Sequence, residues 1–128
     1  MSLQLLDSDV VIDFLKGVER AVRLLRSLRA AQHDLATMPV IVAEVFVGTP
    51  PEGRGYVRLL FDSFVRLPLS DQAAQRAGEL GYDHARRGIQ LTTPDLLIAA
   101  TALEHGATLV TRNIRDYPIA GLSILSPY

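Results

Sequence analysis

The fold is indicated first by residues 3–17, which read Leu3-Gln-Leu-Leu-Asp-Ser-Asp-Val-Val-Ile-Asp-Phe-Leu-Lys-Gly17. The brief apolar run over 3–6 predicts a short buried strand. Ser8 or Asp9 is suited to cap the helix that follows, and Gly17 is suited to end it. Because a strand that passes directly into a helix is the unit of parallel sheets, this segment predicts the start of an α/β domain.

The same alternation continues along the chain. We expect helices over 18–31, 39–47, 56–64, 71–87 and 95–105, and strands over 34–37, 65–69, 108–111 and 122–125. Thr37 is expected to cap the 39–47 helix, although the β-branched residues of that segment would also suit a strand. Alternating strands and helices without tight hairpin signals predict a largely parallel sheet with right-handed crossovers. All of residues 1–128 are expected to form one domain.

Composition narrows the class of protein. The chain is 48% hydrophobic and 21% charged, which is typical of a globular protein. No apolar run reaches the roughly 18 residues of a membrane span, and no secretion leader is visible. There is no cysteine, so disulfides and thiolate metal sites are excluded. We therefore expect a cytoplasmic protein without membrane attachment.

Four acidic residues stand at the edges of hydrophobic segments or inside them. They are Asp7, Glu44, Asp95 and Asp116. In a parallel sheet, sites form beyond the carboxyl ends of the strands, so these side chains are expected to converge there. A set of oxygen ligands without histidine or cysteine suits Mg²⁺ or Mn²⁺. Since such an ion activates water and neutralises a phosphoryl group, the predicted chemistry is phosphoester hydrolysis.

Structural explanations compete with this one. Asp95 alone reads as a helix cap, and Asp9 and Asp13 read as caps or solvent-facing residues, with Asp9 close enough to Asp7 to assist a metal through water. The cap explanation fails for Glu44, because apolar residues flank it on both sides. Since burying an unpaired carboxylate is costly, Glu44 is the strongest functional candidate on physical grounds.

Four motifs, taken together and in order, resemble those of PIN-domain nucleases. They are Leu5-Leu-Asp-Ser-Asp-Val-Val-Ile-Asp-Phe-Leu15, Val42-Ala-Glu-Val-Phe-Val-Gly48, Pro94-Asp-Leu-Leu-Ile-Ala-Ala-Thr-Ala102 and Leu109-Val-Thr-Arg-Asn-Ile-Arg-Asp-Tyr117. The resemblance covers nearly the whole chain. The length of the chain is most similar to that of the VapC-type toxins of toxin–antitoxin pairs.

The resemblance implies a three-layer α/β/α sandwich and a Mg²⁺- or Mn²⁺-dependent ribonuclease that a small antitoxin inhibits. Asp7 and Asp95 would bind the metal directly. Glu44 and Asp116 would complete the acidic pocket, and Asn113 would hold a water or a phosphate. A homodimer is also implied, with the apolar helix around Glu44 near its interface. One departure is Tyr117, which stands where phenylalanine is common.

RNA would be bound through its phosphates, for which arginine is the expected partner. The candidates are Arg112, Arg115, Arg86 and Arg87, each of which could instead be solvated or structurally paired. His33, His84 and His105 show no metal-ligand spacing and are expected at the surface.

Two other functions fit parts of the sequence. Residues 5–10 also fit the aspartate motif of haloacid dehalogenase-like phosphatases, but that chemistry relies on a downstream lysine, and Lys16 is the only lysine. A response-regulator receiver fails for the same reason. The other alternative is a catalytically silent PIN-like binding module, against which the intact acidic set argues.

Overall fold

The computed structural model describes residues 2–128 and contains one sheet of five parallel strands. The strands are β1 (Leu3–Leu6), β2 (Asp34–Thr37), β3 (Val65–Arg66), β4 (Thr108–Val110) and β5 (Ile124–Leu125). Their order across the sheet is β3-β2-β1-β4-β5. The predicted α/β class and parallel sheet are therefore confirmed.

The strand order reverses next to β1. The chain adds β2 and β3 on one side of β1 and then returns to place β4 and β5 on the other side. Ligand sites of parallel sheets lie beyond the carboxyl ends of the strands at such a reversal. The carboxyl ends of β1 and β4, where Asp7 and Thr111 follow, are therefore the expected place for a site.

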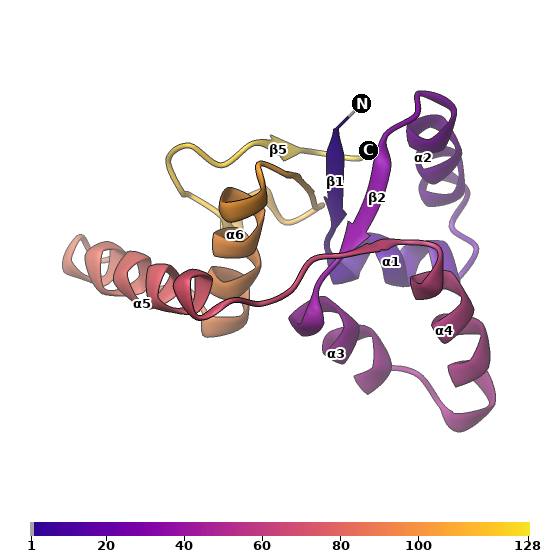
Figure 1. The fold of residues 1–128 in the computed structure, drawn as a ribbon, viewed down its shortest axis with the longest axis horizontal. Helices are drawn as coiled ribbons and strands as arrows, with labels where there is room; N and C mark the ends of the chain where they lie inside the picture. The colour runs from indigo at the N-terminus through magenta and orange to yellow at the C-terminus, as the bar shows by residue number, and fades with distance from the viewer. Residues whose placement is uncertain (1) are drawn as a thin grey trace.

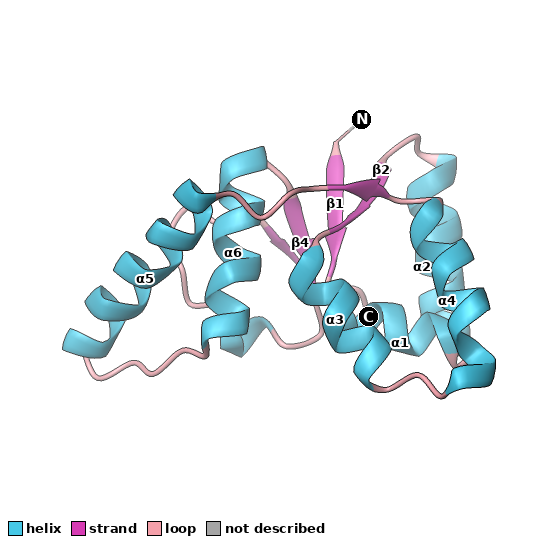
Figure 2. Ribbon diagram, turned by 60° about the horizontal axis from the view of Figure 1, so that its bottom comes forward, coloured by secondary structure: helices cyan, strands magenta, loops and turns pink. Residues whose placement is uncertain are grey.

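Within residues 2–128, six α-helices pack against the sheet. They are α1 (Ser8–Leu15), α2 (Glu19–Ala30), α3 (Pro39–Val47), α4 (Arg54–Asp62), α5 (Asp71–Arg86) and α6 (Thr93–His105), with 3-10 turns η1 (Pro51–Gly53) and η2 (Ile114–Asp116). Figure 1 shows α5 and α6 together on one side of β1, and Figure 2 shows α2 and α4 on the opposite side of the sheet. This layering agrees with the predicted three-layer sandwich.

Two predicted helix caps were wrong. Asp7, rather than Ser8 or Asp9, caps α1, because its side chain accepts a hydrogen bond from the backbone N–H of Ser8. Met38, rather than Thr37, occupies the cap position of α3 and makes no side-chain cap. The hydroxyl of Thr37 is instead buried without a hydrogen-bond partner among residues 2–128.

Other predictions differ by a few residues. The 39–47 segment is a helix, which resolves the strand alternative, and β3 and β5 are shorter than the predicted strands over 65–69 and 122–125. Element ends are set by tertiary hydrogen bonds that a local pattern does not contain. Within residues 2–128, no helix is both long and apolar enough to cross a membrane.

The core lies on both sides of β1 and β4. Leu5, Leu6, Leu109 and Val110 are all fully buried. Strands buried on both faces are mainly apolar, although β1 also contains the buried Gln4. The buried Asp7 and Thr111 come directly after β1 and β4, at the carboxyl edge of the sheet.

Candidate active site

Asp7 leaves the end of β1 and lies almost wholly inside the protein, with 5% of its surface exposed. Its Oδ1 accepts a 2.8 Å hydrogen bond from the backbone N–H of Ser8. Its Oδ2 accepts hydrogen bonds of 2.9 Å from both the Thr111 hydroxyl and the Tyr117 hydroxyl. Buried carboxylates need such partners, and these three donors hold Asp7 in one orientation.

Asp95 lies in the first turn of α6. The alternative prediction, that Asp95 is only the cap of this helix, was wrong. Thr92 is the cap, because its hydroxyl accepts a hydrogen bond from the backbone N–H of Asp95. The Asp95 carboxylate has other contacts, and its Oδ1 lies 3.2 Å from the Tyr117 hydroxyl. Burial raises the pKa of Asp95, hydrogen bonds from the Thr92 and Tyr117 side chains oppose the rise, and the charges of Asp7 and Asp116 add to it.

Glu44 lies in the middle of α3, and its Oε1 is buried without a hydrogen-bond partner in the described part of the chain. Burial raises the pKa of Glu44, and the charges of Asp7, Asp95 and Asp9 raise it further, while a hydrogen bond from the Ser8 side chain opposes the change. Glu44 therefore lies close to the negative charges of Asp7 and Asp9, which follow β1, and of Asp95 at the start of α6.

Asp9 is more enclosed than predicted. Its Oδ2 accepts hydrogen bonds from the backbone N–H of Arg112 at 2.9 Å and from the Thr111 hydroxyl at 3.4 Å. Burial raises the pKa of Asp9, and the charge of Asp7 adds to the rise. Asp9 and Asp13 were predicted to be caps or to face solvent. Both alternatives were wrong, since Asp7 is the cap of α1 and the side chains of Asp9 and Asp13 are only 12% and 15% exposed.

The remaining two predicted residues of the pocket lie at its rim. Asp116 is exposed on η2, and its charge contributes to the raised pKa of Asp95, which places it near that carboxylate. Asn113 is also exposed, and its backbone N–H donates to the Thr111 hydroxyl at 3.0 Å. The structure thus brings Asp7, Asp9, Glu44 and Asp95 together inside and leaves Asp116 and Asn113 outside.

The four predicted RNA-binding arginines have different surroundings. Arg112 is paired, since its Nε lies 3.0 Å from Asp13 Oδ2, and Asp13 also accepts a hydrogen bond from the Tyr128 hydroxyl. The Arg86 guanidinium lies 4.3 Å from the ring centre of Tyr82. Arg115 and Arg87 are exposed, and no salt bridge holds either one within residues 2–128. Arg115 is therefore the candidate that is both next to Asp116 and unpaired in the described part.

Thr111 and Tyr117 belong to the site, although the sequence did not mark them as site residues. The only sequence signal was tyrosine at a position where phenylalanine is common in the family. The prediction that His84 lies at the surface was wrong, since it is 4% exposed. Its ring nitrogens lie 2.7 Å from the Leu80 carbonyl oxygen and 3.1 Å from the Pro118 carbonyl oxygen, so it links α5 to the residue after Tyr117.

The donor set suits a divalent cation. As the side chains stand, no three His, Asp or Glu residues within 2–128 are arranged to hold a metal ion by themselves. Mg²⁺ does not need three, because it usually keeps several waters and takes only one or two carboxylates. The Oε1 of Glu44 has no partner within residues 2–128, and the pKa values of Asp9, Glu44 and Asp95 are raised first by burial and then by neighbouring carboxylates. A bound cation would favour the charged form of these groups.

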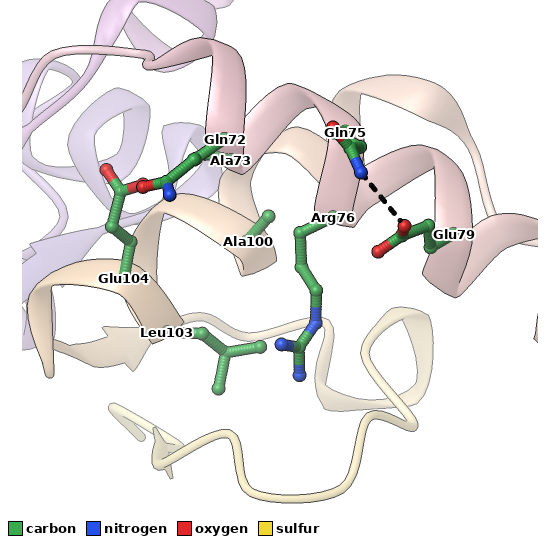
Figure 3. Close-up of a pocket in the computed structure, with 8 residues that line it drawn as sticks. All are labelled: Gln72, Ala73, Gln75, Arg76, Glu79, Ala100, Leu103 and Glu104. Carbon is green, nitrogen blue, oxygen red and sulfur yellow. Dashed lines mark hydrogen bonds between the residues drawn. The ribbon is translucent and has the colours of Figure 1, made fainter.

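A separate hollow of about 410 Å³ lies between α5 and α6 (Figure 3). Arg76 reaches into it toward Leu103, and the side chain of Gln75 donates a hydrogen bond to Glu79 at its rim. None of the predicted site residues lines this hollow. It is a groove between two packed helices, distinct from the acidic site.

Residues 5–120 match the family model of the PIN domain. The chain belongs to the PIN-domain family. Among its relatives, Ribonuclease VapC10 of Mycobacterium tuberculosis is 36% identical over 115 residues, which are 90% of this chain and 86% of that protein. Ribonuclease VapC19 of the same organism is 29% identical over 119 residues, 91% and 94% of the two chains. The predicted resemblance to PIN-domain proteins of the VapC type is confirmed.

Solved structures agree with this PIN-domain assignment. A toxin–antitoxin complex from Klebsiella pneumoniae is 27% identical, with 98% of each chain covered and a TM-score of 0.76. VapBC2 from Rickettsia felis, bound to a DNA fragment from its promoter, is 22% identical, with 96% and 97% covered and a TM-score of 0.85. At that identity the second likeness shows the fold alone. None of these comparisons supports the phosphatase alternative.

Proposed function

We propose that this PIN-domain chain is a Mg²⁺- or Mn²⁺-dependent endoribonuclease and the toxin of a type II toxin–antitoxin pair. The observation that carries the proposal is the convergence of one buried and three half-buried carboxylates at the carboxyl edge of the sheet, where each of Asp9, Glu44 and Asp95 is close enough to Asp7 for the Asp7 charge to raise its pKa. The ribonuclease names of its sequence relatives support the reaction class.

In this proposal, Asp7 and Asp95 are the direct ligands of the ion, and Glu44 and Asp116 complete the acidic pocket. When bound, the ion would neutralise phosphoryl charge and make water a better nucleophile. The protein itself supplies orientation, because Thr111 and Tyr117 fix Asp7. Glu44 is suited to accept a proton from an attacking water, since its pKa is raised and one of its oxygens has no partner.

The substrate would be held at the rim of this pocket. Arg115 stands beside Asp116 on η2 and is exposed, so its guanidinium is available to an RNA phosphate. Arg112 is proposed to act mainly through structure, because its guanidinium is already paired with Asp13. Thus the fourth motif, Leu109–Tyr117, contributes one phosphate contact through Arg115 and one structural ion pair through Arg112.

The antitoxin and a second copy of the chain are proposed partners. Three large hydrophobic residues are exposed at the end of α3 and along α4: Val47 (88%), Leu59 (70%) and Tyr56 (59%). A groove of about 490 Å³ between α1, α3 and α4 lies beside Tyr56. Exposed apolar surface of this kind marks interaction sites, and the Klebsiella pneumoniae neighbour is a toxin–antitoxin complex.

The test is RNA cleavage by purified protein. We expect Asp7→Asn and Asp95→Asn each to abolish cleavage while circular dichroism shows an intact fold. Asp34→Asn, an exposed aspartate at the start of β2, is the matched control and should cleave normally. EDTA should stop cleavage, and Mg²⁺ or Mn²⁺ should restore it. Full activity of either site variant would show that the site is wrongly assigned.

A further inference from the structure

Tyr117 is held rigidly at the acidic site. Its side chain is 3% exposed and packs in the main hydrophobic core. Its backbone N–H donates to the Ile114 carbonyl oxygen at 3.0 Å, and its carbonyl oxygen accepts from the Ile119 N–H at 2.8 Å. His84 approaches the Pro118 carbonyl oxygen from α5. The position of the Tyr117 hydroxyl is therefore set by the core and by two neighbouring elements.

That hydroxyl reaches two carboxylates from different parts of the chain. It lies 2.9 Å from Asp7 Oδ2, which follows β1, and 3.2 Å from Asp95 Oδ1, which lies in α6. These two oxygens cannot be farther apart than the sum of the two distances. A phenol has only one proton, so the two carboxylates share a single donor.

The other donors at the site do not span this pair. The Thr111 hydroxyl serves Asp7 and Asp9, and the backbone N–H of Ser8 serves Asp7. Among residues 2–128, Tyr117 is the donor that hydrogen-bonds to both Asp7 and Asp95. Like charges so close together in a half-buried site repel, and a hydrogen-bond donor between them reduces the repulsion.

We propose that the Tyr117 hydroxyl is a positioning group that holds Asp7 and Asp95 together in the metal-free protein, where it does electrostatically what the cation does when bound. The inference rests on the proposed function in one respect, since it takes these two residues as the ligands. The hydroxyl and the cation then relieve the same repulsion. Removing the hydroxyl destabilises the metal-free state and leaves more repulsion for the cation to relieve.

The test compares Tyr117→Phe with Tyr82→Phe, in which the same atom is removed from an exposed tyrosine of α5. We measure the Tm in EDTA and the affinity for MnCl₂ by calorimetry. Tyr117→Phe should lower the Tm in EDTA and tighten Mn²⁺ binding by about tenfold or more, the scale of one hydrogen bond to a charged group. Tyr82→Phe should change neither quantity. Unchanged or weaker Mn²⁺ binding by Tyr117→Phe would overturn the proposal.

A second comparison separates this role from the loss of an ordinary hydrogen bond. In an Asp95→Asn background the repulsion is already gone, so Tyr117→Phe should lower the Tm in EDTA by much less than in the wild-type background. An equal loss in both backgrounds would contradict the proposal. None of these readouts uses RNA. If the wild-type protein does not cleave RNA, the proposed function alone is contradicted. If Tyr117→Phe changes neither the Tm in EDTA nor the Mn²⁺ affinity, this inference alone is contradicted.

Discussion

The Thr111 hydroxyl donates a 2.9 Å hydrogen bond to Asp7 Oδ2, which joins the exit of β4 to the exit of β1. Thr111 is fully buried and Asp7 nearly so. The same hydroxyl accepts a hydrogen bond from the backbone N–H of Asn113, so it also shapes the turn within the fourth motif, Leu109–Tyr117. One threonine thus connects the first and last of the four motifs.

Thr111→Val keeps the shape of this side chain and removes its hydrogen bonds. We expect the free energy of unfolding to fall by about 1.5–3 kcal/mol, because a buried carboxylate loses a donor. Urea unfolding measures the change. Thr108→Val, at the start of β4, is the control and should cost much less, since within residues 2–128 its hydroxyl hydrogen-bonds to the exposed Ser123. Equal losses in the two variants would show that the Asp7 contact is not special.

Glu44→Gln tests whether the glutamate of α3 is kept for function at a cost in stability. Its Oε1 is buried without a partner, and its pKa is raised by burial and by nearby carboxylates. Removing the charge should raise the Tm measured in EDTA near pH 7, whereas RNA cleavage should fall at least tenfold. The control Glu52→Gln, in the exposed η1 turn, should change neither. A lower Tm for Glu44→Gln would argue that its charge stabilises the fold.

The metal-free protein should have a pH-dependent contribution to stability from Asp9, Glu44 and Asp95. Burial raises their pKa values above the ordinary 3.8 for aspartate and 4.5 for glutamate. The folded state then binds these protons more tightly than the unfolded chain does. Their contribution to stability is therefore lost as the pH rises from about 4 through the raised folded values.

The pH effect is measured as a difference between variants in EDTA. The Tm of Asp95→Asn minus that of the wild type should become more positive between pH 4 and pH 7. The wild type loses stability over this range because the pKa of Asp95 is raised in the folded state, and the variant lacks that carboxyl group. The same difference for Asp34→Asn, an exposed aspartate, should stay flat. Adding Mn²⁺ should raise the wild-type Tm most at the upper end of this range. A difference for Asp95→Asn that shrinks with rising pH would contradict the sign of the shift.

Arg115→Ala tests the proposed phosphate contact. Because Arg115 is exposed and not held in a salt bridge within residues 2–128, its loss should weaken RNA binding without lowering the Tm. The slope of log K against log salt should fall by about 0.7, the value for one contact to single-stranded RNA. Arg76→Ala, in the groove between α5 and α6, is the control and should leave the slope unchanged. Binding would be measured with the Asp7→Asn variant so that the RNA stays intact.

The parts of the site that the sequence predicted are those with a strong local signal. A glutamate inside the apolar run of α3 and an aspartate directly after β1 violate the hydrophobic pattern around them, so Glu44 and Asp7 could be found from the chain alone. Asp95 was ambiguous, because an acid in the first turn of a helix is also explained locally. Its neighbour Thr92 carries the cap, which only the structure shows.

Thr111, Tyr117 and His84 were missed for a common reason. Threonine fits a strand, tyrosine fits a core, and histidine fits a helix end, so none of them disturbs its local pattern. Their partners lie far away along the chain, 104 positions between Thr111 and Asp7 and 34 positions between His84 and Pro118. A hydrogen bond over such a separation leaves no periodic trace in the sequence.

The sequence by itself determined the α/β class, the order of strands and helices, the acidic character of the site and the family. These properties depend on hydrophobic periodicity and on residue types at fixed spacing, which are local. The tertiary structure alone decided that Asp9 is enclosed, that Arg112 is paired, and that one phenol hydroxyl joins Asp7 to Asp95. Those contacts depend on how β1, β4 and α6 pack around a common core, and packing is a property of the whole chain.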